Sequence, residues 1–251
     1  GVMLDADGNG IIDTAASRRD DGPIWPFPRT VCALGERTAL GEFSMRSFRT
    51  VDERVGWGAP ATADVDGDGL GDVFGLDITT GTYGMKRNLG NGQFAPAVVL
   101  AELGELELLG SFRSEDVYPI LADFNGDGTF DLAYVNGGER DIYLRTGDGA
   151  GSFSPPVIAG TAPYLLADWV AEDLDADGVS DLVWTTRSRT AVYYAFGSPS
   201  GMFTTPTSIV GQFPTGIGFT VGDMDSDGDS DLLFSYQATL EASFLQGSRV
   251  F

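Results

Sequence analysis

The sequence predicts an all-β fold assembled from repeated four-stranded antiparallel sheets. Three observations lead to this prediction. An acidic nine-residue pattern occurs five times, with its first aspartates 59, 59, 50 and 50 residues apart. Each repeat carries short runs of β-branched and aromatic residues separated by Gly, Asn, Asp and Pro turns. No segment keeps a 3.6-residue apolar period long enough to indicate a helix.

The elements follow one another in the same order in each repeat. An apolar run comes directly after each of the last four acidic loops, and these runs read DVFGL, DLAYV, DLVWT and DLLFS. We expect them to form strands near the middle of each sheet. A second run, a glycine turn that closes on phenylalanine, and two further runs complete the repeat. The aromatic residues at matching positions of the first runs are predicted to pack between sheets, and they are Phe74, Tyr134, Trp184 and Phe234.

Four strands per 50–59 residues are typical of a β-propeller blade, which buries its faces by stacking against neighbouring blades. We therefore predict one propeller domain over residues 1–251. Its repeats span about 1–54, 55–113, 114–163, 164–213 and 214–251. The last repeat is incomplete, which predicts either a three-stranded final blade or a chain that belongs to a longer protein.

Composition excludes several classes of function. The chain has no histidine and one cysteine, Cys32, which excludes His-dependent catalysis, His-based metal sites and an intrachain disulfide. Its formal charge of −22 argues against nucleic acid as a partner, because phosphate binding needs a basic surface. No apolar run reaches the length of a transmembrane helix.

The acidic pattern itself, D-x-[DN]-x-[DN]-G-x-x-D, is typical of a loop that holds a hard divalent cation. Its copies read DADGNGIID, DVDGDGLGD, DFNGDGTFD, DLDADGVSD and DMDSDGDSD. Side chains at alternate positions of a tight loop converge on one point, and Ca²⁺ takes six to eight oxygen ligands where Mg²⁺ prefers a water-rich octahedron. The aspartates at the ligand positions of these loops number 18 of the 37 acidic residues, so metal sites would account for about half of the acidity. We predict up to five Ca²⁺ ions, one per loop, against the alternative of Asp-Gly turns without metal.

Two stretches resemble a known repeat family. VGWGAPATADVDGDG (55–69) resembles the FG-GAP repeat of integrin α-subunit propellers, and ILADFNGDGTFDLAYVNGG (120–138) resembles its VCBS variant, found in secreted bacterial proteins. The resemblance implies a calcium loop between the first two strands of each blade, and a complete ring that usually has seven blades. The side-chain ligands it implies are Asp5, Asp7, Asn9, Asp13, Asp64, Asp66, Asp68, Asp72, Asp123, Asn125, Asp127, Asp131, Asp173, Asp175, Asp177, Asp181, Asp223, Asp225, Asp227 and Asp231. The carbonyl ligands it implies are those of Ile11, Leu70, Thr129, Val179 and Asp229.

These observations favour an extracellular binding module that recognises carbohydrate or protein, as lectins and adhesion domains with this repeat do. Sugar recognition needs aromatic platforms beside polar groups. The candidates, each with packing as the alternative, are Trp25, Phe27, Tyr118, Tyr164 and Trp169. A second interpretation is an assembly domain of a larger surface or toxin-complex protein. A third, a polysaccharide-active enzyme, is disfavoured because the prominent acids are assigned to metal loops, so we expect a protein without catalytic activity.

Overall fold

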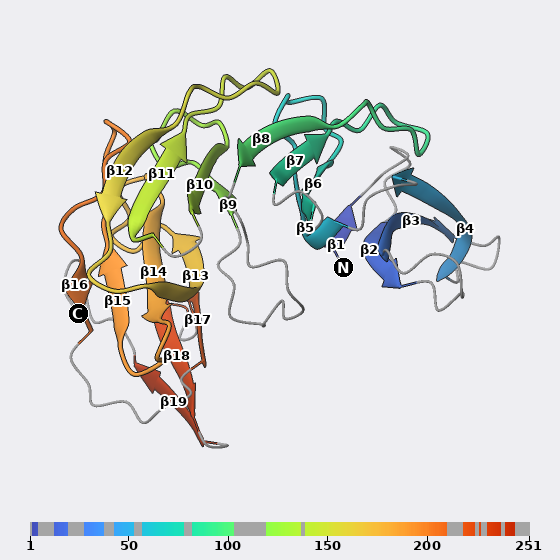
Figure 1. Ribbon diagram of the computed structural model, residues 1–251. Helices are drawn as coiled ribbons and strands as arrows, with labels where there is room; N and C mark the ends of the chain where they lie inside the picture. Colours follow the sequence, from blue (N-terminus) through green and yellow to red (C-terminus); the bar gives the residue numbers. More distant parts are fainter. Residues whose placement is uncertain are drawn as a thin grey trace. The chain divides into compact units, whose positions relative to one another are not determined.

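In a computed structural model, the described residues form five antiparallel sheets, each a meander of consecutive strands (Figure 1). The structure describes residues 2–4, 13–19, 28–37, 43–52, 57–77, 82–102, 119–136, 139–209, 218–223, 226, 230–236 and 239–243. All regular elements in these residues are strands, as the sequence predicts. No helix in this part of the chain is long and apolar enough to cross a membrane.

The chain divides into two compact units, each considered by itself. The first unit comprises Gly1–Ser111 and Asp148–Ser152. It contains two four-stranded sheets. The strands of one are β1 (Val2–Leu4), β2 (Asp13–Arg19), β3 (Pro28–Arg37) and β4 (Phe43–Asp52). The strands of the other are β5 (Trp57–Ala63), β6 (Asp72–Asp77), β7 (Thr82–Lys86) and β8 (Val98–Glu102).

The second unit comprises Phe112–Gly147 and Phe153–Phe251 and contains three sheets. The strands of its first sheet are β9 (Ile120–Ala122), β10 (Asp131–Val135), β11 (Asp141–Arg145) and β12 (Val157–Thr161). The strands of its second sheet are β13 (Leu166–Glu172), β14 (Asp181–Thr186), β15 (Val192–Ala195) and β16 (Thr207–Ser208). The third sheet has three described strands, which are β17 (Gly218–Gly222), β18 (Asp231–Tyr236) and β19 (Thr239–Ser243).

The strand after each acidic loop lies in the interior of its sheet, as predicted. β10 and β14 are buried along their whole length. The outer strands β8 and β12 are exposed at their first two residues. Within the second unit, the first strand β13 of the middle sheet lies beside both β9 and β17, which is the order of inner strands expected of propeller blades.

The core lies between successive sheets. Trp184 is fully buried in a cluster that joins the sheet β9–β12 to the sheet β13–β16, and Phe234 belongs to a second cluster that joins β13–β16 to β17–β19. Phe74 and Tyr134 are also buried. The prediction that these four aromatic residues are buried core positions is therefore confirmed, and Trp184 and Phe234 lie between sheets as expected.

The second residue of each described acidic loop adds to the core, a role that the metal pattern does not reveal. Val65, Phe124 and Leu174 are 5%, 0% and 7% exposed. Phe124 packs edge-to-face on Phe203, with ring centroids 5.5 Å apart. Each loop is thus anchored by one apolar side chain, while the acidic residues before its ninth position lie nearer the surface.

Candidate metal centre

The acidic loops at residues 64–72, 123–131 and 173–181 share one conformation, built around their first aspartate. In the second loop of the sequence, Asp64 Oδ1 accepts hydrogen bonds from the N–H groups of Gly67 and Asp68, at 2.8 and 3.2 Å, and Oδ2 accepts one from Gly69 at 2.9 Å. The third loop repeats all three of these bonds, and the fourth repeats the last two. Each loop joins the first two strands of its sheet, where the family resemblance places it.

The loop turns require left-handed backbone at the fourth and sixth positions. Gly67 and Gly126 occupy the fourth position with φ near +70°, and glycine also occupies the sixth position of each described loop. In the next two repeats the fourth position is instead Ala176 (φ 56°) and Ser226 (φ 64°). A Cβ in this region costs roughly 1 kcal/mol, so these two residues hold a strained conformation.

Replacing Ala176 with Gly should raise the free energy of unfolding by about 0.5–1 kcal/mol, because the left-handed backbone loses its Cβ penalty. The reciprocal change, Gly126→Ala, should destabilise the protein, since its φ is 73° and its new Cβ would lie 3.1 Å from Cγ2 of Val179. Urea unfolding of both variants checks the pair. An Ala176→Gly variant that unfolds at a lower urea concentration than the unaltered protein would contradict this account.

Carboxylate oxygens converge in two of the described loops. One oxygen from each of Asp64, Asp66 and Asp72 lies within 4.8 Å of the others, and the same holds for Asp173, Asp175 and Asp177. Oxygens that share one Ca²⁺ at 2.3–2.6 Å lie at most about 5 Å apart, so both clusters have the size of a calcium shell.

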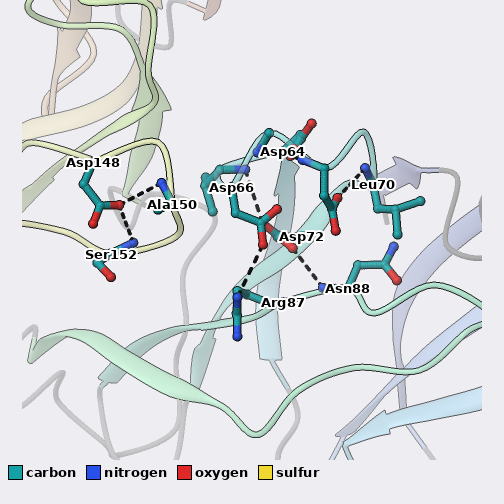
Figure 2. Close-up of polar contacts among 12 residues, drawn as sticks. Asp64, Asp66, Leu70, Asp72, Arg87, Asn88, Asp148, Ala150 and Ser152 are labelled. Carbon is teal, nitrogen blue, oxygen red and sulfur yellow. Dashed lines mark hydrogen bonds and ion pairs between the residues drawn. The ribbon is translucent and has the colours of Figure 1, made fainter.

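Asp66 supplies the observation that best fits a bound cation. Its Oδ1 atom is buried and has no hydrogen-bond partner, while its Oδ2 lies 3.5 Å from Nη1 of Arg87 (Figure 2). A buried carboxylate oxygen without a partner is costly. A cation held between Asp64, Asp66 and Asp72 would satisfy that oxygen, so the chemistry of the loop fits Ca²⁺.

The turn Asp148–Ser152, which belongs to the same unit, covers one side of this loop (Figure 2). The N–H of Gly151 donates to the carbonyl of Val65 at 3.1 Å. Gly151 has φ +83°, and a Cβ there would lie 3.2 Å from Cδ of Arg87 and 3.6 Å from Cβ of Asp66. Glycine thus permits the close approach of this turn to Asp66.

The third loop arranges its side chains differently. Asn125 Nδ2 donates to Asp127 Oδ2 at 3.0 Å, and the hydroxyl of Thr129 donates to Asp127 Oδ1 at 2.6 Å. The hydroxyl bond from Thr129 is the main reason that the pKa of Asp127 falls below its usual value. The carboxylate of Asp127 is therefore satisfied inside the loop, in contrast to that of Asp66.

The ninth aspartate of each described loop ties the loop to the glycine turn that follows the next strand. In the third loop, Asp131 Oδ2 accepts from Phe124 N at 3.0 Å and Oδ1 accepts from Gly147 N at 2.9 Å. Asp72 and Asp181 make the same two bonds, always to the residues 7 before and 16 after. This connection, which we call the ninth-position clamp, joins three segments of one sheet.

Burial raises the pKa of each clamp carboxyl despite the two N–H donors, to about 6 in Asp72 and Asp131 and about 7 in Asp181. The neighbouring aspartates of each loop raise it further. Concentrating negative charge beside a buried carboxylate is unfavourable without a compensating charge. A cation in the loop would supply that charge, in agreement with the geometry.

Removing the clamp should destabilise the protein even without metal. In EGTA, Asp131→Ala is expected to lower the free energy of unfolding by about 2 kcal/mol, because the buried N–H groups of Phe124 and Gly147 lose their acceptor. Urea unfolding measures this loss. Asp127→Ala, which removes an exposed acid of the same loop, is the matched control and should cost less. Equal losses for the two variants would contradict the clamp.

Several predicted residues lie outside the described part of the chain. They are Asp5, Asp7, Asn9, Ile11, Trp25, Phe27, Tyr118, Asp225, Asp227 and Asp229. The backbone of Asp13 begins β2, and that of Asp231 begins β18. Among the aromatic candidates, Tyr164 is 59% exposed, whereas Trp169 is 8% exposed and packs in the cluster that contains Trp184.

Comparison with known proteins assigns part of the chain to a repeat family. The model of an FG-GAP-like repeat matches residues 123–184 and 173–234. No curated protein sequence matches the chain. Among solved structures, a lectin of Agrocybe aegerita, described as recognising non-reducing terminal N-acetylglucosamine, shares the fold with a TM-score of 0.69 at 16% identity. The match covers 97% of this chain and 62% of the lectin, so the chain spans less than two thirds of the lectin's length.

Two further structures align more loosely. The biofilm matrix protein Bap1 of V. cholerae gives a TM-score of 0.45 at 20% identity, covering 95% of this chain and 34% of that one. The Tc holotoxin pore of Photorhabdus luminescens gives a TM-score of 0.42 at 15% identity, and the match covers 94% of this chain and 13% of that one. The matched repeat model, the consecutive four-stranded sheets and the fold shared with the lectin agree with one another. Residues 123–234 therefore consist of FG-GAP-like repeats, and the consecutive sheets of the chain have the fold of β-propeller blades.

Proposed function

We propose that this chain is a calcium-stabilised extracellular propeller that binds carbohydrate. The observation that carries the calcium part is the buried Asp66 Oδ1, which has no hydrogen-bond partner and lies in a cluster with Asp64 and Asp72. In this proposal Asp64, Asp66 and Asp72 hold one ion, and Asp173, Asp175 and Asp177 hold another. The ion contributes positive charge and fixes the loop; it takes no part in a reaction.

Calcium loops of moderate affinity fill where calcium is millimolar, which is outside cells. This relation is the reason for proposing an extracellular location. A propeller whose blades are fixed by ions presents a rigid surface, and the residues that vary between repeats are free to form binding sites on it.

Carbohydrate is the proposed ligand class for two reasons. The lectin that shares this fold is described as binding a sugar, which makes a sugar the first ligand class to test. The second unit also presents an exposed tyrosine, Tyr164, of the kind that stacks on sugar rings. We assign the chain a binding role and no catalytic one.

A glycan array tests the ligand class. The protein should bind at least one class of glycan in about 2 mM calcium, a concentration of the order found outside cells. Binding should fall in excess EGTA and return when calcium is restored. Absence of binding to every glycan in calcium would contradict the carbohydrate proposal. Binding that is unchanged in EGTA would contradict the link between calcium and the binding surface.

A further inference from the structure

One end of the sheet β13–β16 gathers aromatic and charged side chains away from its acidic loop. The loop 173–181 joins β13 to β14 at one end of the sheet, while β13 starts and β14 stops at the other end. There the segment before β13 meets the turn after β14, because the N–H of Arg187 donates to the carbonyl of Leu165 at 2.8 Å. The features described below lie at or next to this second end.

Three aromatic rings lead from the core to the surface. Trp184 is fully buried, and its ring is nearly parallel to that of Tyr193, with centroids 6.1 Å apart and an interplanar angle of 19°. Tyr193 in turn contacts Tyr164 at 6.0 Å. Tyr164 is 59% exposed. The exposed ring is therefore backed by two others, which limits its movement and leaves much of its surface to solvent.

An ion pair accompanies the rings. Arg189 Nη2 lies 3.0 Å from Asp168 Oδ2, and the two side chains are 28% and 46% exposed. The Nε atom of Arg189 is buried and has no hydrogen-bond partner. The partly exposed pair thus offers carboxylate acceptors together with guanidinium donors.

Both charged residues sit on irregular backbone. Asp168 lies where the pairing of β13 with β14 shifts register, between Leu166 and Trp169. Arg189 has φ 53° in the turn after β14. Bulges and left-handed residues cost free energy and are found often at binding sites, where they direct a side chain.

The group is specific to this repeat. Fifty residues earlier, the positions of Tyr164, Asp168 and Arg189 hold Ser114, Tyr118 and Glu139. Fifty residues later they hold Pro214, Gly218 and Thr239. Packing that is common to all blades would place similar residues in each repeat, so this combination calls for another explanation.

We propose that Tyr164, Asp168 and Arg189 form a binding site for a neutral pyranose sugar. The C–H face of a pyranose would stack on the exposed ring of Tyr164, while neighbouring hydroxyls bind the Asp168 carboxylate and the Arg189 guanidinium. The net charge of −22 favours a neutral ligand over an anionic one. This inference rests on the proposed carbohydrate function and assigns it to one place in the chain.

The test measures binding of single sugars by saturation-transfer NMR and calorimetry in calcium buffer. The probes are N-acetylglucosamine, N-acetylgalactosamine and the methyl glycosides of glucose, galactose, mannose and fucose. The variants are Tyr164→Ala, Tyr164→Phe and Asp168→Asn. Met202→Ala is the matched control, since Met202 is 46% exposed and lies outside this end, in the glycine turn that follows β15.

At least one probe should bind the unaltered protein. Tyr164→Ala should weaken binding of that sugar by about tenfold, which corresponds to ~1.4 kcal/mol, and Asp168→Asn should weaken it by a similar factor. Tyr164→Phe keeps the ring, and Met202→Ala lies outside the site. The dissociation constants of these two variants for the sugar should stay within about twofold of that of the unaltered protein. If Tyr164→Ala does not fold, the affinities of Asp168→Asn and Tyr164→Phe for the sugar are compared instead. Weaker binding by Asp168→Asn than by Tyr164→Phe would support the site, and equal binding by the two variants would overturn it.

The outcomes separate the two proposals. Binding that survives both Tyr164→Ala and Asp168→Asn would overturn this site and leave the carbohydrate function standing. The site would also be overturned if the protein bound oligosaccharides on an array but bound none of the single sugars. Absence of binding in both assays would overturn the site together with the proposed function.

Discussion

Chelation of calcium is expected to lower the melting temperature by about 10–20 °C. A ligand at 100 times its dissociation constant stabilises the folded state by about 2.7 kcal/mol, so two occupied loops contribute about 5 kcal/mol. For a chain of this size each kcal/mol corresponds to about 2–4 °C. Without the ion, the aspartates of each loop repel one another and the buried oxygen of Asp66 has no hydrogen-bond partner. Thermal unfolding in EGTA and in calcium measures the difference.

Three controls sharpen this result. Calcium added back in excess should restore the melting temperature, whereas magnesium should restore less of it, because its octahedral shell retains water. Asp66→Ala should lower the melting temperature in calcium by less than EGTA does, since the other loops keep their ions and blades couple mainly to neighbours. A melting temperature that is the same with and without EGTA would contradict a structural role for calcium.

Truncating Trp184 to Ala should destabilise the second unit by about 3–5 kcal/mol, the usual cost of removing a large buried aromatic side chain. Trp184 is fully buried and lies in the cluster that joins two sheets. The substitution would leave a cavity there and would remove the ring that backs Tyr193. Denaturant unfolding in calcium, followed by circular dichroism, gives the loss.

The same aromatic stack provides the control for this change. Tyr164→Ala removes a ring that is 59% exposed and should cost less than about 1 kcal/mol, within the range for surface substitutions. Trp184→Phe retains part of the ring, so its loss in the free energy of unfolding should lie between those of Trp184→Ala and Tyr164→Ala. A loss below about 1 kcal/mol for Trp184→Ala would contradict the claim that the buried cluster around Trp184 holds these two sheets together.

The sequence was sufficient to predict the strands because their pattern is local. Apolar runs bounded by Asp and Gly turns fix where β10 and β14 begin, and repetition fixes how many strands follow. The burial of Phe74, Trp184 and Phe234 followed from their matching positions in the repeats. Convergence of the carboxylates also followed from alternate spacing, and it is seen in the second and fourth loops.

Contacts between segments distant in the sequence could not be predicted in the same way. The ninth-position clamp depends on strand pairing that brings Gly147 to Asp131, although the constant separation of 16 residues between clamp and turn was available as a signal. The pairing of Asp168 with Arg189 depends on a bulge and on a left-handed residue, neither of which has a clear sequence signature.

Calorimetric titration of calcium into chelator-stripped protein tests the central claim most directly. The account predicts at least two bound ions per chain, one in each loop where the carboxylates converge, and the loss of one ion in Asp66→Ala. Loss of that site would connect the buried oxygen of Asp66 to the metal. A titration without saturable binding, or an Asp66→Ala variant that binds the same number of ions, would contradict the account.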